Sequence, residues 1–177
     1  AALADMPLVP GSPGAITDAA LAKEMADKIG YPVILKASAG GGGRGMRIVE
    51  KPETMERHFK SAHEEALAAF GNGDMFIEKY LVNPKHLEFQ ILGDKHGNVI
   101  HLGERECSLQ RKHQKIVEEA PSASISDENR VKMGELAVKF AKSIGYYSAG
   151  TIEFILDEDG EYYFMEMNTR IQVEHPV

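Results

Sequence analysis

Hydrophobic residues in the first half of the chain follow two spacings, which together predict a small unit of strands and helices. Short apolar runs favour strands, whereas apolar residues three and four positions apart favour amphipathic helices. We expect strands at 33–37, 46–50 and 75–80 and helices at 17–30 and 52–70. Thr17 and Asp18 can cap the first helix, and the glycine-rich segment 38–45 is predicted to be a loop between the first two strands.

The second half of the chain has longer apolar runs separated by turn-forming residues. We expect strands at 86–92 and 98–106, a polar segment at 108–119, a helix at 126–145, and a hairpin of strands at 149–156 and 161–168. Strands from distant parts of the chain must assemble there, so the pattern predicts an α+β fold built on an antiparallel sheet. We therefore divide the chain into an N-terminal linker at 1–7, a small lobe at 8–80 and part of a larger lobe at 81–177.

Composition and charge narrow the class of partner. The chain of 177 residues has a formal net charge of −7, which argues against nucleic-acid or anionic-membrane binding because both need a basic surface. Cys107 is the only cysteine, which excludes an internal disulfide and favours a reducing cytosol. No segment resembles a signal peptide or membrane span, so we expect a soluble protein. The chain does not begin with Met and stops directly after a patterned polar segment, so we expect a fragment.

The glycine run GGGGRG at 40–45 admits several interpretations. A dinucleotide-binding fold would need a helix to start at the last glycine, but residues 46–50 alternate like a strand. A Walker A loop would need a following Gly-Lys-Ser or Gly-Lys-Thr, which is missing. The remaining interpretations are a strand-loop-strand hairpin whose backbone N–H groups close over phosphate oxygens, with Lys36 as a point charge, or an ordinary flexible surface loop.

Two glutamates are predicted to share one face of the hairpin at 149–168. With Asp159 and Gly160 as the turn, Glu153 lies opposite Glu166; with a turn one residue earlier, Glu153 lies opposite Phe164 and diagonal to Glu166. Carboxylates crowded on such apolar strands would repel each other unless a divalent cation lay between them, and Mg²⁺ is the natural candidate. Asn168 faces the same way; a plain solvated sheet face is the alternative.

Every second residue from 166 to 174 is polar, which predicts an extended segment with one polar face and one buried apolar face. The guanidinium of Arg170 suits a small planar oxyanion, and Glu174 could act as a general base beside it. Residues 110–115 form a basic cluster that can supply further cations. The histidines and the cysteine show no spacing typical of a zinc site.

Four motifs together resemble the biotin carboxylase component of biotin-dependent carboxylases. They are YPVILKASAGGGGRGM at 31–46, EKYL at 78–81, ERECSLQRKHQK at 104–115 and EMNTRIQVEHPV at 166–177. The glycine loop and the acidic hairpin alone would indicate only the wider ATP-grasp superfamily, which includes carbamoyl-phosphate synthetase. The run through His113, Gln114 and Lys115 and the ending RIQVEHP at 170–176 look specific to biotin carboxylases. The resemblance implies an ATP-grasp fold, with the glycine-loop hairpin and two helices as a small lid and part of a larger antiparallel-sheet lobe.

The resemblance implies which residues bind the nucleotide. Lys36 and the glycine loop would contact the ATP phosphates, with the loop contacts made by Gly41, Gly42, Gly43, Arg44 and Gly45. The adenine would lie at Glu78, Lys79 and Leu81. The remaining members of the nucleotide pocket would be His86, Gln110 and His113.

The resemblance also implies the metal and bicarbonate sites. Glu153 and Glu166 would bridge Mg²⁺ or Mn²⁺, with Asn168 nearby. Bicarbonate would be held by Lys115, Arg170, Gln172 and the Val173 backbone, and Glu174 would remove its proton. The product would be carboxyphosphate, which supplies CO₂ to biotin after the lid closes over the site.

The resemblance further implies the setting of the parent enzyme. It would be a ligase that acts on biotin attached to a biotin carboxyl carrier protein, works with a carboxyltransferase, forms a homodimer, and lies in the cytoplasm or, in a eukaryote, the mitochondrial matrix. We expect this chain to bind ATP and metal but not to turn over alone. The alternatives are another ATP-grasp ligase, such as one that makes carbamoyl phosphate, and a non-catalytic nucleotide-binding module. The final acceptor of the carboxyl group is left open.

Overall fold

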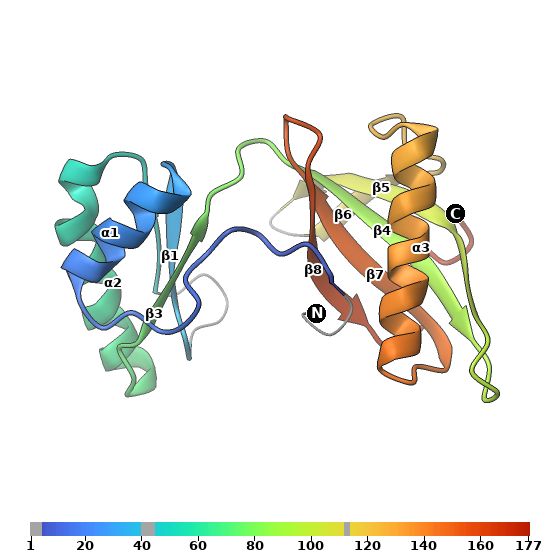
Figure 1. Cartoon of the computed structure of the whole chain (residues 1–177), viewed down its shortest axis with the longest axis horizontal. Helices are drawn as coiled ribbons and strands as arrows, with labels where there is room; N and C mark the ends of the chain where they lie inside the picture. The colour runs from blue at the N-terminus through green and yellow to red at the C-terminus, as the bar shows by residue number, and fades with distance from the viewer. Residues whose placement is uncertain (1–4, 40–44, 112–113) are drawn as a thin grey trace. The chain divides into compact units, whose positions relative to one another are not determined.

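The computed structural model describes residues 5–39, 45–111 and 114–177, which form two compact units (Figure 1). The smaller unit is Val9–Leu81, and the larger unit combines residues 5–8 with Val82–Val177. Each unit has a hydrophobic core of its own. The mixture of helices and antiparallel sheets confirms the predicted α+β class.

The smaller unit is a three-stranded antiparallel sheet covered by two helices. Its strands are β1 (Val33–Ala37), β2 (Met46–Val49) and β3 (Met75–Lys79), in the order β2-β1-β3. The helices α1 (Ala19–Ile29) and α2 (Met55–Phe70), the latter preceded by a short 3₁₀ turn at Pro52–Thr54, lie on the same side of the sheet (Figure 1). Buried alanines on both helices let them pack closely against alternate buried side chains of the strands.

Local chemistry explains where these helices begin and end. Asp18 is the N-cap of α1, because its carboxylate accepts a hydrogen bond from the Leu21 amide at 2.9 Å. Gly71 ends α2 in the left-handed conformation, with φ of 71°, and its N–H donates to the Leu67 carbonyl. The predicted positions of both helices are therefore confirmed to within a few residues.

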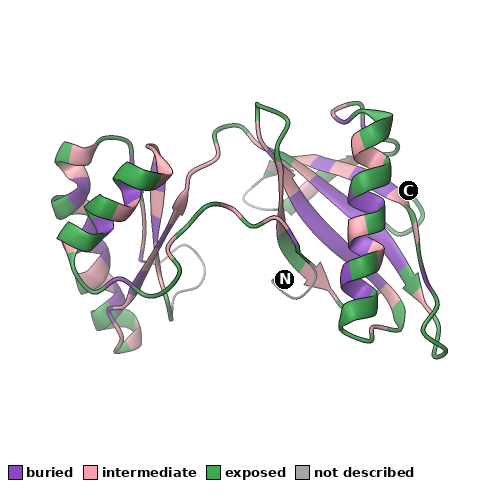
Figure 2. Ribbon diagram, viewed as in Figure 1, coloured by how far each residue is buried: buried purple, intermediate pink, exposed green. Residues whose placement is uncertain are grey.

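The larger unit is a five-stranded antiparallel sheet with one helix on one face. Its strands, in the order β6-β5-β4-β7-β8, are β4 (Lys85–Gly93), β5 (Val99–Arg111), β6 (Gln114–Glu119), β7 (Ser148–Leu156) and β8 (Tyr162–Asn168). The helix α3 (Asp127–Ser143) crosses this sheet (Figure 1). Figure 2 shows that burial is concentrated on the central strands β4 and β7.

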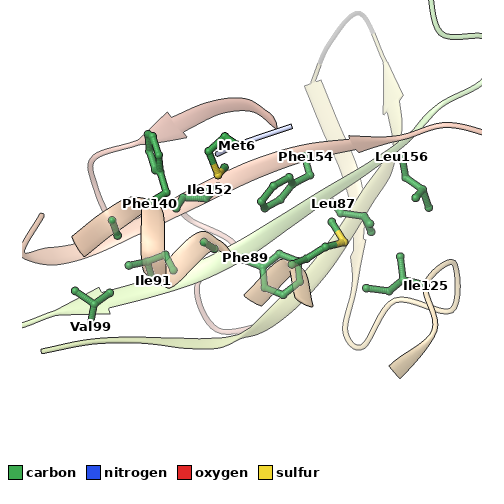
Figure 3. Close-up of a cluster of buried hydrophobic side chains, with 13 residues drawn as sticks. Met6, Leu87, Phe89, Ile91, Val99, Ile125, Phe140, Ile152, Phe154 and Leu156 are labelled. Atoms are coloured by element: carbon green, nitrogen blue, oxygen red, sulfur yellow. The ribbon is translucent and has the colours of Figure 1, made fainter. Parts of the chain in front are cut away.

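The core of the larger unit lies between α3 and the sheet. Leu87, Phe89 and Ile91 of β4 and Ile152 and Phe154 of β7 are each 0% exposed, and Figure 3 shows these side chains gathered together. The rings of Phe89 and Phe154 meet edge to face with centroids 5.8 Å apart. Alternation along β4 therefore directs the odd-numbered apolar residues to the helix and the even-numbered residues to the opposite face.

The helix α3 begins at a side-chain cap and is joined to the sheet by an ion pair. Ser126 accepts a hydrogen bond from the Asn129 amide at 3.2 Å, and the first turn carries Asp127 and Glu128. Arg130 donates through Nε to Glu104 of β5 at 2.7 Å.

Across the described parts of the chain, the helices all lack the length and apolar character that a bilayer span requires.

Three sequence-based expectations about the fold are wrong. Residues 108–119 were expected to be an irregular polar segment, but they form the end of β5 and the edge strand β6. An edge strand buries few side chains, so Ile116 and Val117 are 55% and 43% exposed and the usual alternation is hidden. Residues 5–7 were expected within a linker, yet Met6 is 5% exposed in the core and the Pro7 carbonyl accepts a hydrogen bond from the Phe164 amide at 2.7 Å.

The third wrong expectation is the extended polar segment from 166 to 174. The strand β8 ends at Asn168, and turns follow in which the His175 amide donates to the Gln172 carbonyl at 3.2 Å. The exposure pattern is reversed from the prediction: Gln172 is 8% and Glu174 7% exposed, whereas Val173 is 92% exposed. The polar side chains turn inward because they find hydrogen-bond partners on the sheet, which the next subsection describes.

The core of the larger unit gives a first testable prediction. Replacing Phe89 with Ala should destabilise this unit by about 3 to 5 kcal/mol, because a buried aromatic ring is lost and a cavity remains. Hydrogen exchange read by mass spectrometry should show faster exchange in β4 and β7. Leu102→Ala on β5 is the control, because Leu102 is 55% exposed; equal effects of the two changes would contradict this description of the core.

Candidate functional site

A cluster of polar side chains lies on the face of the larger sheet opposite α3. Glu88 and Gln90 of β4 point to this face because they alternate with the core residues Leu87, Phe89 and Ile91. Glu88 is 0% exposed and Gln90 4% exposed. Buried polar groups of this kind are costly unless they are fully paired, so their partners define the site.

Lys115 of β6 lies at the centre of the cluster. Its Nζ donates to a carboxylate oxygen of Glu88, to Oε1 of Glu153 at 3.2 Å and to Oε1 of Glu174 at 2.9 Å. Burial alone would lower the pKa of Lys115, but the hydrogen bonds and charges of these carboxylates outweigh it and raise the pKa above its ordinary value. Lys115 is therefore a fixed ammonium that joins two strands and the C-terminal segment.

Glu153 of β7 is the most heavily contacted carboxylate in this cluster. His86 Nε2 lies 2.8 Å from its Oε2, and the side-chain amide of Asn168 donates to its Oε1 at 2.8 Å. Burial would raise the pKa of Glu153, but the hydrogen bond from His86, together with the charge and hydrogen bond of Lys115, lowers it to about 2. Glu153 is therefore ionised throughout the physiological pH range.

The hydrogen bonds of His86 define its tautomer. The side-chain amide of Gln110 donates to Nδ1 of His86 at 2.7 Å and to the Cys107 carbonyl at 2.9 Å. Because Nδ1 accepts, the proton lies on Nε2, which donates to Glu153. Gln110 thus orients the imidazole, and the ring in turn orients the carboxylate.

In the hairpin Glu153 lies opposite Glu166, but the turn matches neither of the two predicted turns. Near the turn, Leu156 pairs with Tyr162 and Phe154 with Phe164, a register that would bring Glu153 opposite Met165. A β-bulge between Glu153 and Phe154 shifts the register by one residue, so that Glu153 pairs with Glu166. The bulge thereby returns Glu166 to the face that carries Glu153.

The oxygen atoms of this hairpin fit a hard divalent cation such as Mg²⁺ or Mn²⁺. Glu153 and Glu166 are opposite each other, Asn168 pairs with Thr151 two positions away, and Glu166 is exposed enough to meet a ligand. His86, Glu88 and Glu153 also offer ligand atoms within 4.8 Å of one another. The ammonium of Lys115 already contacts two of those three residues, Glu88 and Glu153, so a cation held by the trio would have to displace it.

Some of the predicted residues in the C-terminal segment lie in the cluster, and others are exposed to solvent. Gln172 accepts a hydrogen bond from the Thr151 hydroxyl, and Glu174 pairs with Lys115. Burial would raise the pKa of Glu174, but the hydrogen bond and charge of Lys115 lower it. Arg170 is exposed, with Nη1 donating to the Ile171 carbonyl at 3.2 Å, and lies outside these contacts.

The smaller unit carries the predicted nucleotide residues. Lys36 pairs with Glu78 diagonally across β1 and β3. The ammonium of Lys79 donates to the carbonyls of Gly30 and Tyr31 at 3.0 and 3.1 Å, so it serves the C-terminus of α1. Leu81 is half-buried. The predicted residues Gly41, Gly42, Gly43, Arg44 and His113 lie outside the described residues.

Gly45 is the one member of the glycine loop that the structure describes. Its φ is 68°, and a side-chain carbon there would lie 2.7 Å from the Cβ of Ala37. Only glycine fits this position without displacement of β1. The requirement explains at least part of the glycine content of the loop by packing, independently of any ligand.

Sequence reasoning missed three buried members of the cluster: Glu88, Gln90 and Arg105. Arg105 of β5 donates through Nε to Oε1 of Glu88 at 2.6 Å and through Nη2 to Oε1 of Gln90 at 3.0 Å. Alternation in the strand at 86–92 did mark Glu88 and Gln90 as one face, but such a face is ordinarily solvated. Only the arrival of β6 and the C-terminal segment buries it.

The chain is similar to known proteins over nearly its whole length. The model of the family described as "Carbamoyl-phosphate synthase L chain, ATP binding domain" matches residues 1–177. The 2-oxoglutarate carboxylase small subunit of Hydrogenobacter thermophilus is 63% identical over 174 residues, which are 98% of this chain and 37% of that protein. The biotin carboxylase of a Nostoc species is 58% identical over 174 residues, which are 98% of this chain and 39% of that protein.

A solved structure of a relative is also similar. It is the biotin carboxylase domain dimer of the Hydrogenobacter thermophilus 2-oxoglutarate carboxylase in complex with MgADP, ADP and bicarbonate, with 63% identity and a TM-score of 0.81. The match covers 98% of this chain and 38% of that chain. The chain therefore spans less than two fifths of these relatives. Plant relatives are named as chloroplastic and as mitochondrial proteins.

The pKa of Glu153 predicts how stability changes in acid. A folded-state pKa of about 2, below the ordinary 4.5, means that ionised Glu153 stabilises the fold above pH 4.5 and that this stabilisation is lost as the pH falls toward 2. The loss should be about 3 kcal/mol. Urea unfolding of the chain in a chelating buffer measures the free energy of unfolding. For Glu153→Gln this free energy should change less as the pH falls toward 2 than it does for the unchanged chain. Glu158→Gln, at the exposed turn of the same hairpin, should keep the original profile; identical profiles for both variants would contradict the assignment.

Proposed function

The chain belongs to the family of the carbamoyl-phosphate synthase L chain ATP-binding domain, and on this premise we propose that its parent protein is a biotin carboxylase. The parent would use ATP and bicarbonate to carboxylate biotin. The observation that carries this proposal is the half-buried ammonium of Lys115, held by Glu88, Glu153 and Glu174 beside the Glu153–Glu166 pair. This membership and the solved relative confirm the predicted ATP-grasp fold.

In this proposal Glu153 and Glu166 hold Mg²⁺ or Mn²⁺, with Asn168 as a further oxygen ligand. The support is chemical: oxygen donors on one sheet face suit a hard cation, and the solved relative contains MgADP. A bound metal would offset negative charge on the phosphate oxygens of ATP. Asn168 would then release Glu153 and turn its carbonyl oxygen toward the cation, since its amide now donates to Glu153.

Each unit carries residues that we propose to contact the nucleotide. Lys36 and the loop of Gly41, Gly42, Gly43, Arg44 and Gly45 would meet the phosphates, which requires Lys36 to exchange Glu78 for a phosphate oxygen. Adenine would contact the backbone of Glu78, Lys79 and Leu81. The side chain of Lys79 is already engaged, because its ammonium donates to carbonyls at the C-terminal end of α1. His86, Gln110 and His113 would complete the pocket, with Gln110 fixing the imidazole of His86.

Bicarbonate would bind between Lys115, Arg170, Gln172 and the backbone of Val173. Glu174 would take its proton, for which it must be ionised, and the lowered pKa of Glu174 beside Lys115 satisfies this condition. The solved relative contains bicarbonate. Arg170 would have to turn inward from its exposed position, which its long side chain allows.

The larger assembly is also part of the proposal. Residues 8–80 would act as a lid that excludes water from the carboxyphosphate intermediate, and residues 81–177 would carry the metal and the base. The parent would be a homodimer that works with a biotin carboxyl carrier protein and a carboxyltransferase in the cytoplasm or an organelle. Because the chain spans less than two fifths of its relatives, we expect ATP binding but no turnover from the chain alone.

Calorimetry tests the metal site directly. Titration of the chain with Mg·ATP should show binding that Glu153→Ala/Glu166→Ala weakens by about tenfold or more, because a divalent cation loses two anionic ligands. The control is Glu158→Ala/Glu161→Ala, which removes the same charge from the exposed turn of the same hairpin. Equal losses in both double variants would mean general electrostatics and would contradict the metal assignment.

Steady-state kinetics of the parent protein tests the reaction. ATP hydrolysis should depend on bicarbonate, increase with free biotin and ignore ammonia. Glu174→Gln should lower kcat by about a hundredfold or more, because a neutral amide cannot take the proton. Hydrolysis that responds to ammonia and not to biotin would instead favour a ligase that makes carbamoyl phosphate.

A further inference from the structure

Arg105 is the most deeply buried cation of the described cluster, yet it has no role in the proposed reaction. Its side chain is 3% exposed, against 17% for Lys115. It does not reach the exposed side of the cluster, where a ligand would arrive. Because Glu88 is 0% exposed, the charge of Glu88 must be balanced within the protein, and Arg105 takes one of its two oxygens.

Gln90 fixes the guanidinium of Arg105 in place. Its Oε1 accepts from Nη2 of Arg105 at 3.0 Å, while its Nε2 donates to the Gly150 carbonyl of β7 at 2.9 Å. The planar fork of arginine can reach Glu88 and Gln90 together, whereas the single ammonium of a lysine cannot match both directions. Arg105 is therefore anchored to the backbone of two central strands.

Lys115 donates to the other oxygen of Glu88, and all of its N–H groups are engaged in hydrogen bonds. Its three N–H groups are used by Glu88, Glu153 and Glu174. An anion that binds to Lys115 must therefore replace one of these carboxylates. Glu174 is the one that can leave, because Glu88 and Glu153 lie within β4 and β7 and Glu174 lies in the turns after β8.

The charge balance of the cluster depends on Arg105. Glu88, Glu153 and Glu174 face Lys115 and Arg105, which leaves one negative charge in excess when His86 is neutral. Without Arg105 the excess would be two charges, and Glu88 would have Lys115 as its only cation. An incoming anion would then meet stronger repulsion and a lysine more tightly bound to Glu88.

We propose that Arg105 is a positioning residue for anion binding: it neutralises Glu88, so that Lys115 can exchange Glu174 for bicarbonate. The proposal rests on the proposed function, because it names the residue that keeps the bicarbonate site usable. Arg105 itself touches no substrate. It acts through Glu88, and its effect should fall on bicarbonate and not on ATP.

The same sheet offers a matched control. Arg130 pairs with Glu104, whose side chain is 1% exposed, through the same Nε geometry at 2.7 Å. Glu104 neighbours Arg105 in sequence but points to the α3 face. Arg130→Met therefore also leaves a buried glutamate without its arginine, while Lys115 and its partners are untouched.

Kinetics of the parent protein tests the proposal. Arg105→Met should raise KM for bicarbonate by about tenfold or more, since one partner of a buried charge pair is lost, and should change KM for ATP by less than about twofold. Arg130→Met should leave both KM values unchanged. Equal increases in both KM values for Arg105→Met, or an increase in KM for bicarbonate in Arg130→Met, would overturn the proposal and indicate a general structural role.

Arg105→Lys keeps the test decisive if the methionine variant does not fold. It retains the charge that neutralises Glu88 but loses the contact with Gln90, so KM for bicarbonate should rise above that of the wild type by less than about tenfold, while KM for ATP stays unchanged. A KM for bicarbonate equal to that of the wild type would show that the charge alone suffices and would support the neutralisation of Glu88. Equal increases in both KM values would overturn the positioning role.

A crystal structure of the Arg105→Met chain separates this proposal from the proposed function. Lys115 already contacts one oxygen of Glu88 and should turn to contact the other, which the loss of Arg105 leaves without its partner. Its distance to Glu174 should then grow from 2.9 Å to beyond about 3.5 Å, where direct hydrogen bonding ends. An unmoved Lys115 would overturn the positioning role even if the parent is a biotin carboxylase. A parent without bicarbonate-dependent hydrolysis would overturn the proposed function, and the position of Lys115 in the variant would still decide the role of Arg105.

Discussion

The ion cluster around Lys115 is the constraint on which the larger unit depends. Three carboxylates from β4, β7 and the C-terminal segment converge on one ammonium, and each of them is 7% exposed or less. Carboxylates this close and this buried would repel one another without the cation. The edge strand β6, which carries Lys115, therefore has its position set by electrostatics more than by apolar burial, since Ile116 and Val117 remain largely exposed.

The two faces of the larger sheet differ in composition: one carries the hydrophobic core and the other carries the polar cluster. The face under α3 packs Leu87, Phe89 and Phe154 into a dry core that fixes the strand spacing. The other face uses the same strands to hold Glu88 and Glu153 at set positions. The β-bulge in the β7–β8 pair is the local device that brings Glu166 to the chemical face, so a change of one residue in register would separate the carboxylates.

Two lysines that we propose to meet anions are each paired with a carboxylate in this structure. Lys36 pairs with Glu78 in the smaller unit, and Lys115 pairs with Glu174 in the larger unit. Each pair satisfies a charge that would otherwise be costly. Under the proposed function, binding would replace one ionic contact by another, so that the affinity would reflect the difference between them.

The sequence by itself determined the fold class, the positions of most elements, the family and several members of the polar cluster. Periodicity found α1, α2, α3 and most strands, and the acidic hairpin pointed to Glu153 and Glu166 as a pair. The reason is that these features are local: turns, caps and alternation act between residues close in the chain. The motif at 166–177 likewise named Gln172 and Glu174 without any knowledge of their surroundings.

Only the tertiary structure decided which polar residues are buried and with whom they pair. Glu88, Gln90 and Arg105 were not among the predicted site residues, β6 lay within a predicted polar segment, and the residues after Asn168 looked extended. Their true environment is created by contacts between residues far apart in the chain, such as Lys115 with Glu174. Burial and charge pairing are properties of the assembled sheet, and local sequence spacing carries no information about them.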